Sequence, residues 1–225
     1  MRIGGFQKLS LLNYPDRTAC TIFLSGCNFR CPYCHNSGLA EGREPEIDPD
    51  KILAYLRKRK NLLEGVCISG GEPLMSADVL DFIAQIKQMG FPIKLDTNGS
   101  KPELREKAVR DKLIDYAAMD VKNSAEKYSE TAGIAAAPLE NIRQSISLLK
   151  ENRISYEFRT TVVREFHTAG DIKAIAQELK GGAVWYLQSF RNTPEIPLQG
   201  LNACDSNEME FFGSVGNRYL KTIIR

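Results

Sequence analysis

Several features that would assign a protein to a specialised class are missing from this 225-residue chain. Its charges are nearly balanced, with 30 basic and 28 acidic residues and a net charge of +2, so the composition gives no reason to expect a nucleic acid partner. No apolar run approaches the ~18 residues that a membrane-spanning helix needs. The first ten residues have neither the apolar segment nor the cleavage site of a signal peptide. We therefore expect a cytoplasmic protein with no membrane partner.

The chain also lacks the cysteine pattern of a disulfide framework or of a structural zinc site. It has six cysteines, and without a signal peptide these are better interpreted as free thiols than as disulfide partners. Structural zinc usually takes four Cys or His ligands in two separated pairs, and no second pair is present. Cys20 and Cys67 lie in apolar runs, which predicts buried thiols, and Cys204 is expected to be incidental.

What the chain does have is a group of three cysteines, Cys27, Cys31 and Cys34, close together in the sequence. They follow an apolar, β-branched run at residues 21–24 that ends at Ser25-Gly26, so we expect them on a loop that leaves the end of a buried strand. A 4Fe–4S cluster usually takes four cysteines, one for each iron. Three ligands would leave one iron with an open coordination position for a substrate or cofactor.

The chain has two histidines, and neither is expected to bind a metal. His35 follows Cys34 directly, and adjacent residues rarely bind different corners of one cluster. We therefore expect His35 at the rim of the site. His167 is expected in a loop.

Strand-like apolar runs alternate with amphipathic helices six times along the chain. Strands are expected at residues 21–24, 66–69, 92–95, 116–121, 156–163 and 183–187, and one of the helices should begin with Asp48 as N-cap and Pro49 at its first position. Such alternation predicts a parallel sheet with right-handed crossovers. Six units are fewer than the eight of a full barrel, which takes ~250 residues.

The predicted fold is therefore α/β, an open, partial (β/α)6 TIM-like barrel whose active site lies at the C-terminal ends of the strands. We expect a single domain over residues 1–225, with a core at about 18–190 and a C-terminal extension at about 191–225. The extension should contain a short helix and a terminal strand.

Polar or glycine-containing motifs follow successive predicted strands at the same end. They are the three cysteines, then Gly70-Gly71-Glu72-Pro73, then Asp96-Thr97-Asn98-Gly99, then Asp120 and Lys122, then Arg159 on the fifth strand, and residues 188–192 after the sixth. In a parallel barrel all of these converge on one rim. The motif Gly-Gly-Glu alone is most often a turn, as is Asp-Thr-Asn-Gly, but the arrangement of all these motifs around three cysteines indicates one functional site.

The spacing C-x3-C-x2-C, with the aromatic Tyr33 just before the last cysteine, resembles the motif of the radical S-adenosylmethionine (radical SAM) enzymes. Residues 3–7, Tyr14-Pro15 and residues 25–36 look like those of the glycyl-radical-enzyme activating enzymes, in particular the activating proteins of anaerobic ribonucleoside-triphosphate reductase. The similarity extends over essentially the whole chain.

This resemblance implies an oxidoreductase that works without oxygen and holds a 4Fe–4S cluster. S-adenosylmethionine would bind the open iron through its amino and carboxylate groups. One electron from a flavodoxin or ferredoxin would cleave it to methionine and a 5′-deoxyadenosyl radical. The radical would take a hydrogen atom from a backbone glycine of a partner glycyl-radical enzyme, expected to be anaerobic ribonucleotide reductase.

The resemblance also assigns roles to individual residues. Cys27, Cys31 and Cys34 would bind the cluster. For the cofactor, Tyr33 would lie against the adenine, Gly70, Gly71 and Glu72 would receive the amine, and Lys122 would contact the carboxylate, while Arg159 matches an arginine on the fifth strand. Asp96, Thr97 and Asp120 fall where some activating enzymes hold a monovalent cation. From the residues alone, Asp96 and Asp120 fit two solvated acids at strand ends equally well.

Two departures from the family pattern bear on the partner. Tyr14-Pro15 is followed by Asp16 instead of the usual glycine, and Gln188-Ser189-Phe190 stands where several activating enzymes have a histidine. Two other functions remain open at this point. One is a radical SAM enzyme that acts on a small molecule or nucleoside, similar to a deazapurine carboxylate synthase, and the other is a non-enzymatic module that holds iron or zinc on three cysteines.

Overall fold

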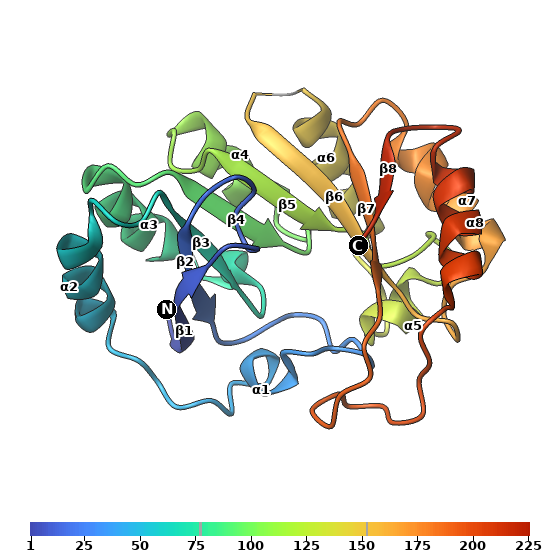
Figure 1. Ribbon diagram of the computed structural model, residues 1–225, viewed down its shortest axis with the longest axis horizontal. Helices are drawn as coiled ribbons and strands as arrows, with labels where there is room; N and C mark the ends of the chain where they lie inside the picture. Colours follow the sequence, from blue (N-terminus) through green and yellow to red (C-terminus); the bar gives the residue numbers. More distant parts are fainter. Residues whose placement is uncertain (77, 152) are drawn as a thin grey trace.

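The computed structural model describes residues 1–76, 78–151 and 153–225 (Figure 1). Its centre is one eight-stranded sheet in which the strands follow each other in chain order. The strands are β1 (Ile3–Ser10), β2 (Ala19–Leu24), β3 (Gly65–Gly70), β4 (Ile93–Thr97), β5 (Tyr116–Asp120), β6 (Ser155–Val162), β7 (Trp185–Ser189) and β8 (Thr222–Ile224). All neighbours from β2 to β8 are parallel, and β1 is antiparallel to β2. The prediction of an open, partial α/β barrel is confirmed.

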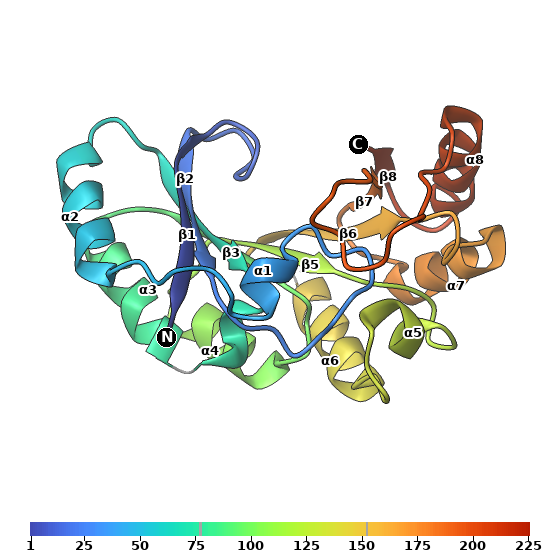
Figure 2. The same ribbon diagram turned by 90° about the horizontal axis from the view of Figure 1, so that it is seen from below.

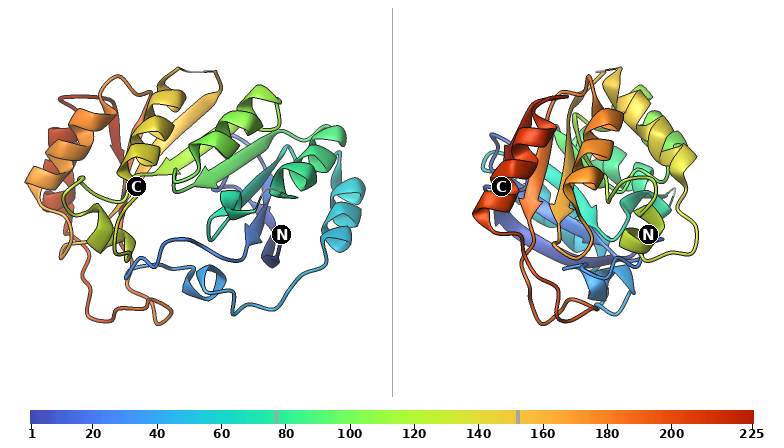
Figure 3. Two further views of the ribbon diagram at one scale, coloured as in Figure 1. Left: turned by 180° about the vertical axis from the view of Figure 1, so that it is seen from behind. Right: turned by 90° about the vertical axis from the view of Figure 1, so that its right-hand side faces the viewer.

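Most of the helices cover the convex face of the curved sheet, while the first of them lies apart from that face, and the concave side stays open between the β1–β2 loop and β8 (Figure 1 and Figure 2). They are α1 (Ser37–Ala40), α2 (Pro49–Arg59), α3 (Asp78–Gln88), α4 (Pro102–Arg110), α5 (Tyr128–Ala132), α6 (Leu139–Lys150), α7 (Ala169–Leu179) and α8 (Ser206–Gly216), with a 3-10 turn at Pro73–Met75. On the outer face α4 packs against α6 and α7 against α8 (Figure 3). Within the described ranges no helix is long and apolar enough to cross a membrane.

The predicted start of α2 is confirmed, because the Asp48 side chain accepts a hydrogen bond from the Asp50 N–H at 2.9 Å and Pro49 occupies the first turn. Apolar side chains of α2 and α3 cover β2, β3 and β4 in one core cluster, and those of α6, α7 and α8 cover β5, β6 and β7 in a second. Alternate residues of the middle strands point the other way, into the concave side. The C-terminal helix and strand were also predicted.

Three short elements were not predicted. Residues 3–10 form β1. A side chain at Gly4 would overlap Ser25, so this glycine allows β1 to approach the segment after β2 closely. The segments 37–40 and 128–132 form the helices α1 and α5. Both are single turns, too short to show the periodicity of a helix.

Candidate functional site

A cavity of about 510 Å³ lies at the carboxyl ends of the parallel strands, where the rim was predicted. The predicted site residues that line it are Cys27, Cys31, Tyr33, Cys34, Gly70, Gly71, Asp96, Thr97, Asp120, Lys122 and Arg159. They come from five successive strands and the loops that follow them. The structure therefore brings together all but one of the residues that the sequence placed in the site, and Glu72 lies behind the wall.

The cysteine loop is held in place by the two helices that the sequence did not reveal. Backbone N–H groups of Gly26 and Cys27 donate to carbonyls at the end of α1, at 2.8 and 3.1 Å. On the other side, the N–H of Arg30 donates to the carbonyl of Ala132 in α5 at 2.9 Å. Gly133 follows with a φ of 65° and packs so closely on the Arg30 carbonyl that a side chain there would overlap it. These contacts fix a loop that has no regular structure of its own.

The chemistry of this loop fits an iron–sulfur cluster. Every cysteine of the described residues is a free thiol, and three of them face one cavity. Among the described residues, no three His, Cys, Asp or Glu side chains converge closely enough to share one metal ion. A 4Fe–4S cluster binds each cysteine to a different iron, so its ligands are spread over a larger volume. Tyr33 also lines this cavity, and its hydroxyl is buried without a hydrogen-bond partner.

The thiols are protonated at neutral pH when nothing is bound to them. Burial raises the pKa of Cys31 to about 11, although the nearby Lys122 opposes this effect. Burial also raises the pKa of Cys27 and of Cys34. A metal that binds these sulfurs must therefore displace their protons.

Gly70 and Gly71 join the end of β3 to the cysteine loop. Gly70 has a φ of 117°, and side chains at either position would overlap the backbone of Leu24 or Gly26. The Gly71 N–H donates to the Leu24 carbonyl, and the Glu72 N–H donates to the Gly26 carbonyl, both at 2.9 Å. The two glycines thus leave a bare backbone edge at the cavity, and their packing against the neighbouring strand end explains why no other residue fits.

Glu72 connects two strand ends from inside the protein. The residue is 1% exposed. Its carboxylate accepts hydrogen bonds from the Thr97 hydroxyl (2.8 Å), the Asn98 N–H (2.6 Å) and the Leu74 N–H (3.1 Å). Burial raises the pKa of this carboxyl to about 7 in spite of the three donors. The carboxylate is fully engaged with the protein and does not face the cavity.

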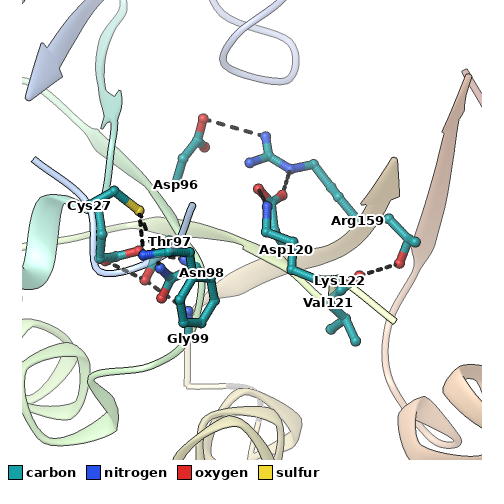
Figure 4. A network of polar contacts seen from close by, with 12 residues as sticks. Cys27, Asp96, Thr97, Asn98, Gly99, Asp120, Val121, Lys122 and Arg159 are labelled. Atoms are coloured by element: carbon teal, nitrogen blue, oxygen red, sulfur yellow. Dashed lines mark hydrogen bonds and ion pairs between the residues drawn. The ribbon is translucent and has the colours of Figure 1, made fainter. Parts of the chain in front are cut away.

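Buried charges alternate across the floor of the cavity, from β4 through the end of β5 to β6 (Figure 4). Asp96 pairs with Lys94 and, at 3.4 Å, with Arg159; Asp120 accepts from Arg159 at 2.8 Å and from Lys122 at 3.0 Å. Burial alone would raise the pKa of both carboxyls, but Arg159 and the lysines hold it below the usual range. Asp96, Asp120, Lys122 and Arg159 line this cavity, so two anions and two cations balance there, while Lys94 borders a second, adjoining cavity.

Two members of the site were missed by sequence reasoning. Lys94 is 2% exposed and pairs with Asp96; its position two residues before that acid, on the same face of a strand, was the signal that could have revealed it. His167 lies in the loop between β6 and α7, as predicted, but it is buried, and its Nε2 lies 2.9 Å from the Lys122 carbonyl. Because a carbonyl only accepts, Nε2 carries the proton, and the imidazole holds the Lys122 backbone in place.

A segment after β7, residues 190–201, crosses the cysteine loop. The ring of His35 lies 2.6 Å from the carbonyl of Arg191, the Ser37 hydroxyl donates to the Glu195 carbonyl at 2.7 Å, and the Leu198 N–H donates to the Pro32 carbonyl at 3.0 Å. His35 lines the cavity as predicted for a rim residue. The segment therefore closes one side of the site.

A second cavity of about 820 Å³ adjoins the first on the open side of the barrel. The two cavities share Asn13, Asp96, Arg159, Gln188, Ser189 and Arg191. The wall of the second cavity consists of the β1–β2 loop on one side and Glu157, Tyr186 and Arg225 on the other. In that loop Leu11 and Leu12 are 73% and 88% exposed, an unusual apolar edge beside a charged cavity.

Comparison with known proteins agrees with this geometry. Residues 21–179 match the profile of the Radical SAM superfamily. A protein of Methanocaldococcus jannaschii that bears the name of a glycyl-radical enzyme activating enzyme is 32% identical over 228 residues, which cover 99% of this chain and 94% of the relative. The anaerobic ribonucleoside-triphosphate reductase-activating protein of Salmonella typhi is 34% identical over 96 residues, which cover 40% of this chain and 60% of that protein. The solved structure of Streptococcus suis SuiB matches the fold with a TM-score of 0.71 at 14% identity, over 91% of this chain and 48% of SuiB.

Proposed function

The chain belongs to the radical SAM superfamily, and from this membership we propose that it activates a glycyl-radical enzyme by forming a radical on a backbone glycine of that partner. The observation that carries the proposal is the similarity, over nearly the whole of both chains, to a protein named for this activity. The free thiols, the charged floor and the open side of the barrel are what such a reaction requires.

Cys27, Cys31 and Cys34 would hold the 4Fe–4S cluster, because they are the three thiols that face the cavity. When bound, the cluster supplies the electron that cleaves the sulfonium of S-adenosylmethionine to methionine and a 5′-deoxyadenosyl radical. The rest of the site binds and orients. The bare backbone at Gly70 and Gly71 borders the cavity where the cofactor's amine would lie, and the buried ring of Tyr33 offers an apolar face to the adenine.

Lys122, on the charged floor, would neutralise the carboxylate of S-adenosylmethionine. Its positive charge opposes the rise in pKa of Cys27, Cys31 and Cys34, so this cation lies near all three thiols. His167 fixes the backbone from which Lys122 extends. Arg159 already binds two carboxylates, so we assign it the role of holding Asp96 and Asp120 in register.

The second cavity gives a partner loop a route to the site. A glycine in a folded partner is reached only if a loop enters the barrel, and the open side between the β1–β2 loop and β8 leads to side chains that both cavities share. The exposed Leu11 and Leu12 at this entrance would pack on apolar side chains of that loop. A small molecule would need no such entrance, which favours the activating enzyme over a small-molecule enzyme.

Anaerobic ribonucleotide reductase as the partner, a flavodoxin or ferredoxin as electron donor, and a cytoplasmic location remain parts of the proposal. The monovalent cation near Asp96 and Asp120 also stays a prediction; three cationic side chains already neutralise these acids.

The test is reductive cleavage of S-adenosylmethionine by the anaerobically reconstituted protein with dithionite. The assay is run with and without a candidate glycyl-radical enzyme under electron paramagnetic resonance. We expect 5′-deoxyadenosine together with a glycyl doublet on the partner. Cleavage with no doublet on any anaerobic partner would redirect the search to small-molecule or nucleoside substrates. A full cluster without cleavage would contradict both enzymatic functions.

A further inference from the structure

Cys27 differs from an isolated thiol because two N–H donors are directed at its sulfur. The backbone N–H of Phe29 lies 3.3 Å from Sγ, within the same loop. The side-chain amide of Asn98, from the turn after β4, lies 3.9 Å from the same atom (Figure 4). The Asn98 contact is the longer one, but it comes from a different strand end and a side chain that is almost fully buried.

The orientation of the Asn98 amide is determined by its other partners. Its Oδ1 accepts from the Ser100 N–H at 3.0 Å, so the nitrogen must point the opposite way. There Nδ2 donates one hydrogen to Oδ1 of Asn28 at 2.9 Å, and the other hydrogen is left for the sulfur of Cys27. A flipped amide would place two acceptors against each other at Asn28, so the donor faces the sulfur.

The turn that carries Asn98 is anchored on both sides. The Asn98 N–H donates to buried Glu72, and two side chains of α6 hold the following residues: the Ser145 hydroxyl donates to the Gly99 carbonyl at 2.7 Å, and the Asn141 amide donates to the Ser100 carbonyl at 3.0 Å. Because these contacts come from the core and from an outer helix, Asn98 cannot move away from Cys27 without breaking several of them.

We propose that Asn98 is a positioning residue that donates an N–H···S hydrogen bond to Cys27 and so raises the reduction potential of the cluster held there. A hydrogen bond to a ligand sulfur withdraws negative charge from it, which favours the reduced, more negative state of the cluster. The proposal requires that Cys27 binds the cluster and is independent of the partner and substrate.

The experiment is a redox titration of the reconstituted, full-length protein, followed by the reduced-cluster signal in electron paramagnetic resonance. In Asn98→Ala the ratio of reduced to oxidised cluster at a fixed potential should fall about tenfold, which for one electron corresponds to about 59 mV. Asn28→Ala is the matched control, because it breaks the same inter-loop bridge but keeps the donor to the sulfur; its potential should equal that of the unmodified protein.

Asn98→Leu covers the case in which the alanine variant does not fold or hold a cluster. Leucine has a similar size, carries no charge and lacks the N–H that faces sulfur, so its cluster should also be harder to reduce. An unchanged potential in either Asn98 variant would overturn the proposal. An equal shift in Asn28→Ala would overturn it too, because it would trace the effect to loop geometry. Iron and sulfide content, measured on the same samples, reports separately on whether the cysteines hold the cluster.

Discussion

Arg159 donates from Nε to Oδ1 of Asp120 at 2.8 Å, across the pair of strands β5 and β6. The same guanidinium lies 3.4 Å from Asp96 on β4, so one side chain connects three strands beneath the cavity. An arginine can do this because its planar group presents several donors at once. Its loss would leave two buried carboxylates with one lysine each.

We therefore predict that Arg159→Met lowers the free energy of unfolding by about 3 kcal/mol at pH 7, as for other broken buried ion pairs. The pKa of each carboxyl is lowered in the folded protein, so the stability they contribute is present above their unfolded pKa and is lost as the pH falls. The deficit of the variant should accordingly shrink in acid. Urea unfolding at pH 7 and at pH 3, which lies below the usual Asp pKa of 3.8, measures both effects. Arg143→Met removes an exposed ion pair to Glu178 and should change stability by less than about 1 kcal/mol; equal losses in both variants would contradict the prediction.

Replacing Cys31 by alanine should abolish cluster binding, because it removes one of the three thiols at the cavity. Iron and sulfide content after anaerobic reconstitution, with the visible absorbance of the cluster, measures this loss. Cys204→Ala is the matched control, since Cys204 is also a buried free thiol but does not line the cavity. A Cys31 variant that retained a full cluster would remove this residue from the ligand set.

Lys122→Met should weaken the binding of S-adenosylmethionine by ~10–100-fold, about 1.4–2.8 kcal/mol, because a charge-assisted contact to the carboxylate is lost. Isothermal titration of the reconstituted protein gives the affinity. Cluster absorbance should be unchanged, which separates a binding defect from a damaged cluster. If the affinity stays the same, another cation neutralises the cofactor.

Leu11→Ser combined with Leu12→Ser should reduce activation of the partner several-fold, since two exposed apolar side chains at the entrance of the second cavity are lost. Cleavage of S-adenosylmethionine without the partner should not change. Leu62→Ser, at an exposed leucine that does not border either cavity, serves as the control. Equal activation by the double variant and the unmodified protein would argue against entry of the partner past this loop.

The residues at the rim could be predicted from the sequence because each belongs to a short motif at the end of a predicted strand, and the parallel topology brings these strand ends together. A strand end followed by cysteines, glycines or acids is readable along the chain, and parallel strands bring these ends to one edge. The buried position of Glu72 could not be predicted, because it depends on which neighbour accepts its side chain across the sheet. The same holds for His167, whose partner is a backbone carbonyl 45 residues away.

His167 should make folding sensitive to mild acid. Burial lowers its pKa below the usual 6.5, so the unfolded chain takes up this proton at a higher pH than the folded protein. Stability from His167 is therefore complete above pH 6.5 and falls as the pH drops toward the lowered pKa, with a slope of up to about 1.4 kcal/mol per pH unit. Glu72 acts in the opposite sense: its pKa is raised to about 7, so its contribution is complete below pH 4.5 and is lost as the pH rises through 7.

The contribution of His167 must consequently be measured as a difference between variants. His167→Gln retains a donor toward the Lys122 carbonyl but has no proton to gain, so the difference in unfolding free energy between the unmodified protein and this variant should shift in favour of the variant between pH 7.5 and pH 5.5. His35→Gln is the control: since the chain has two histidines and His35 lies at the rim, this variant should keep the acid dependence. A pH-independent difference for His167→Gln would mean that the imidazole does not titrate in this range.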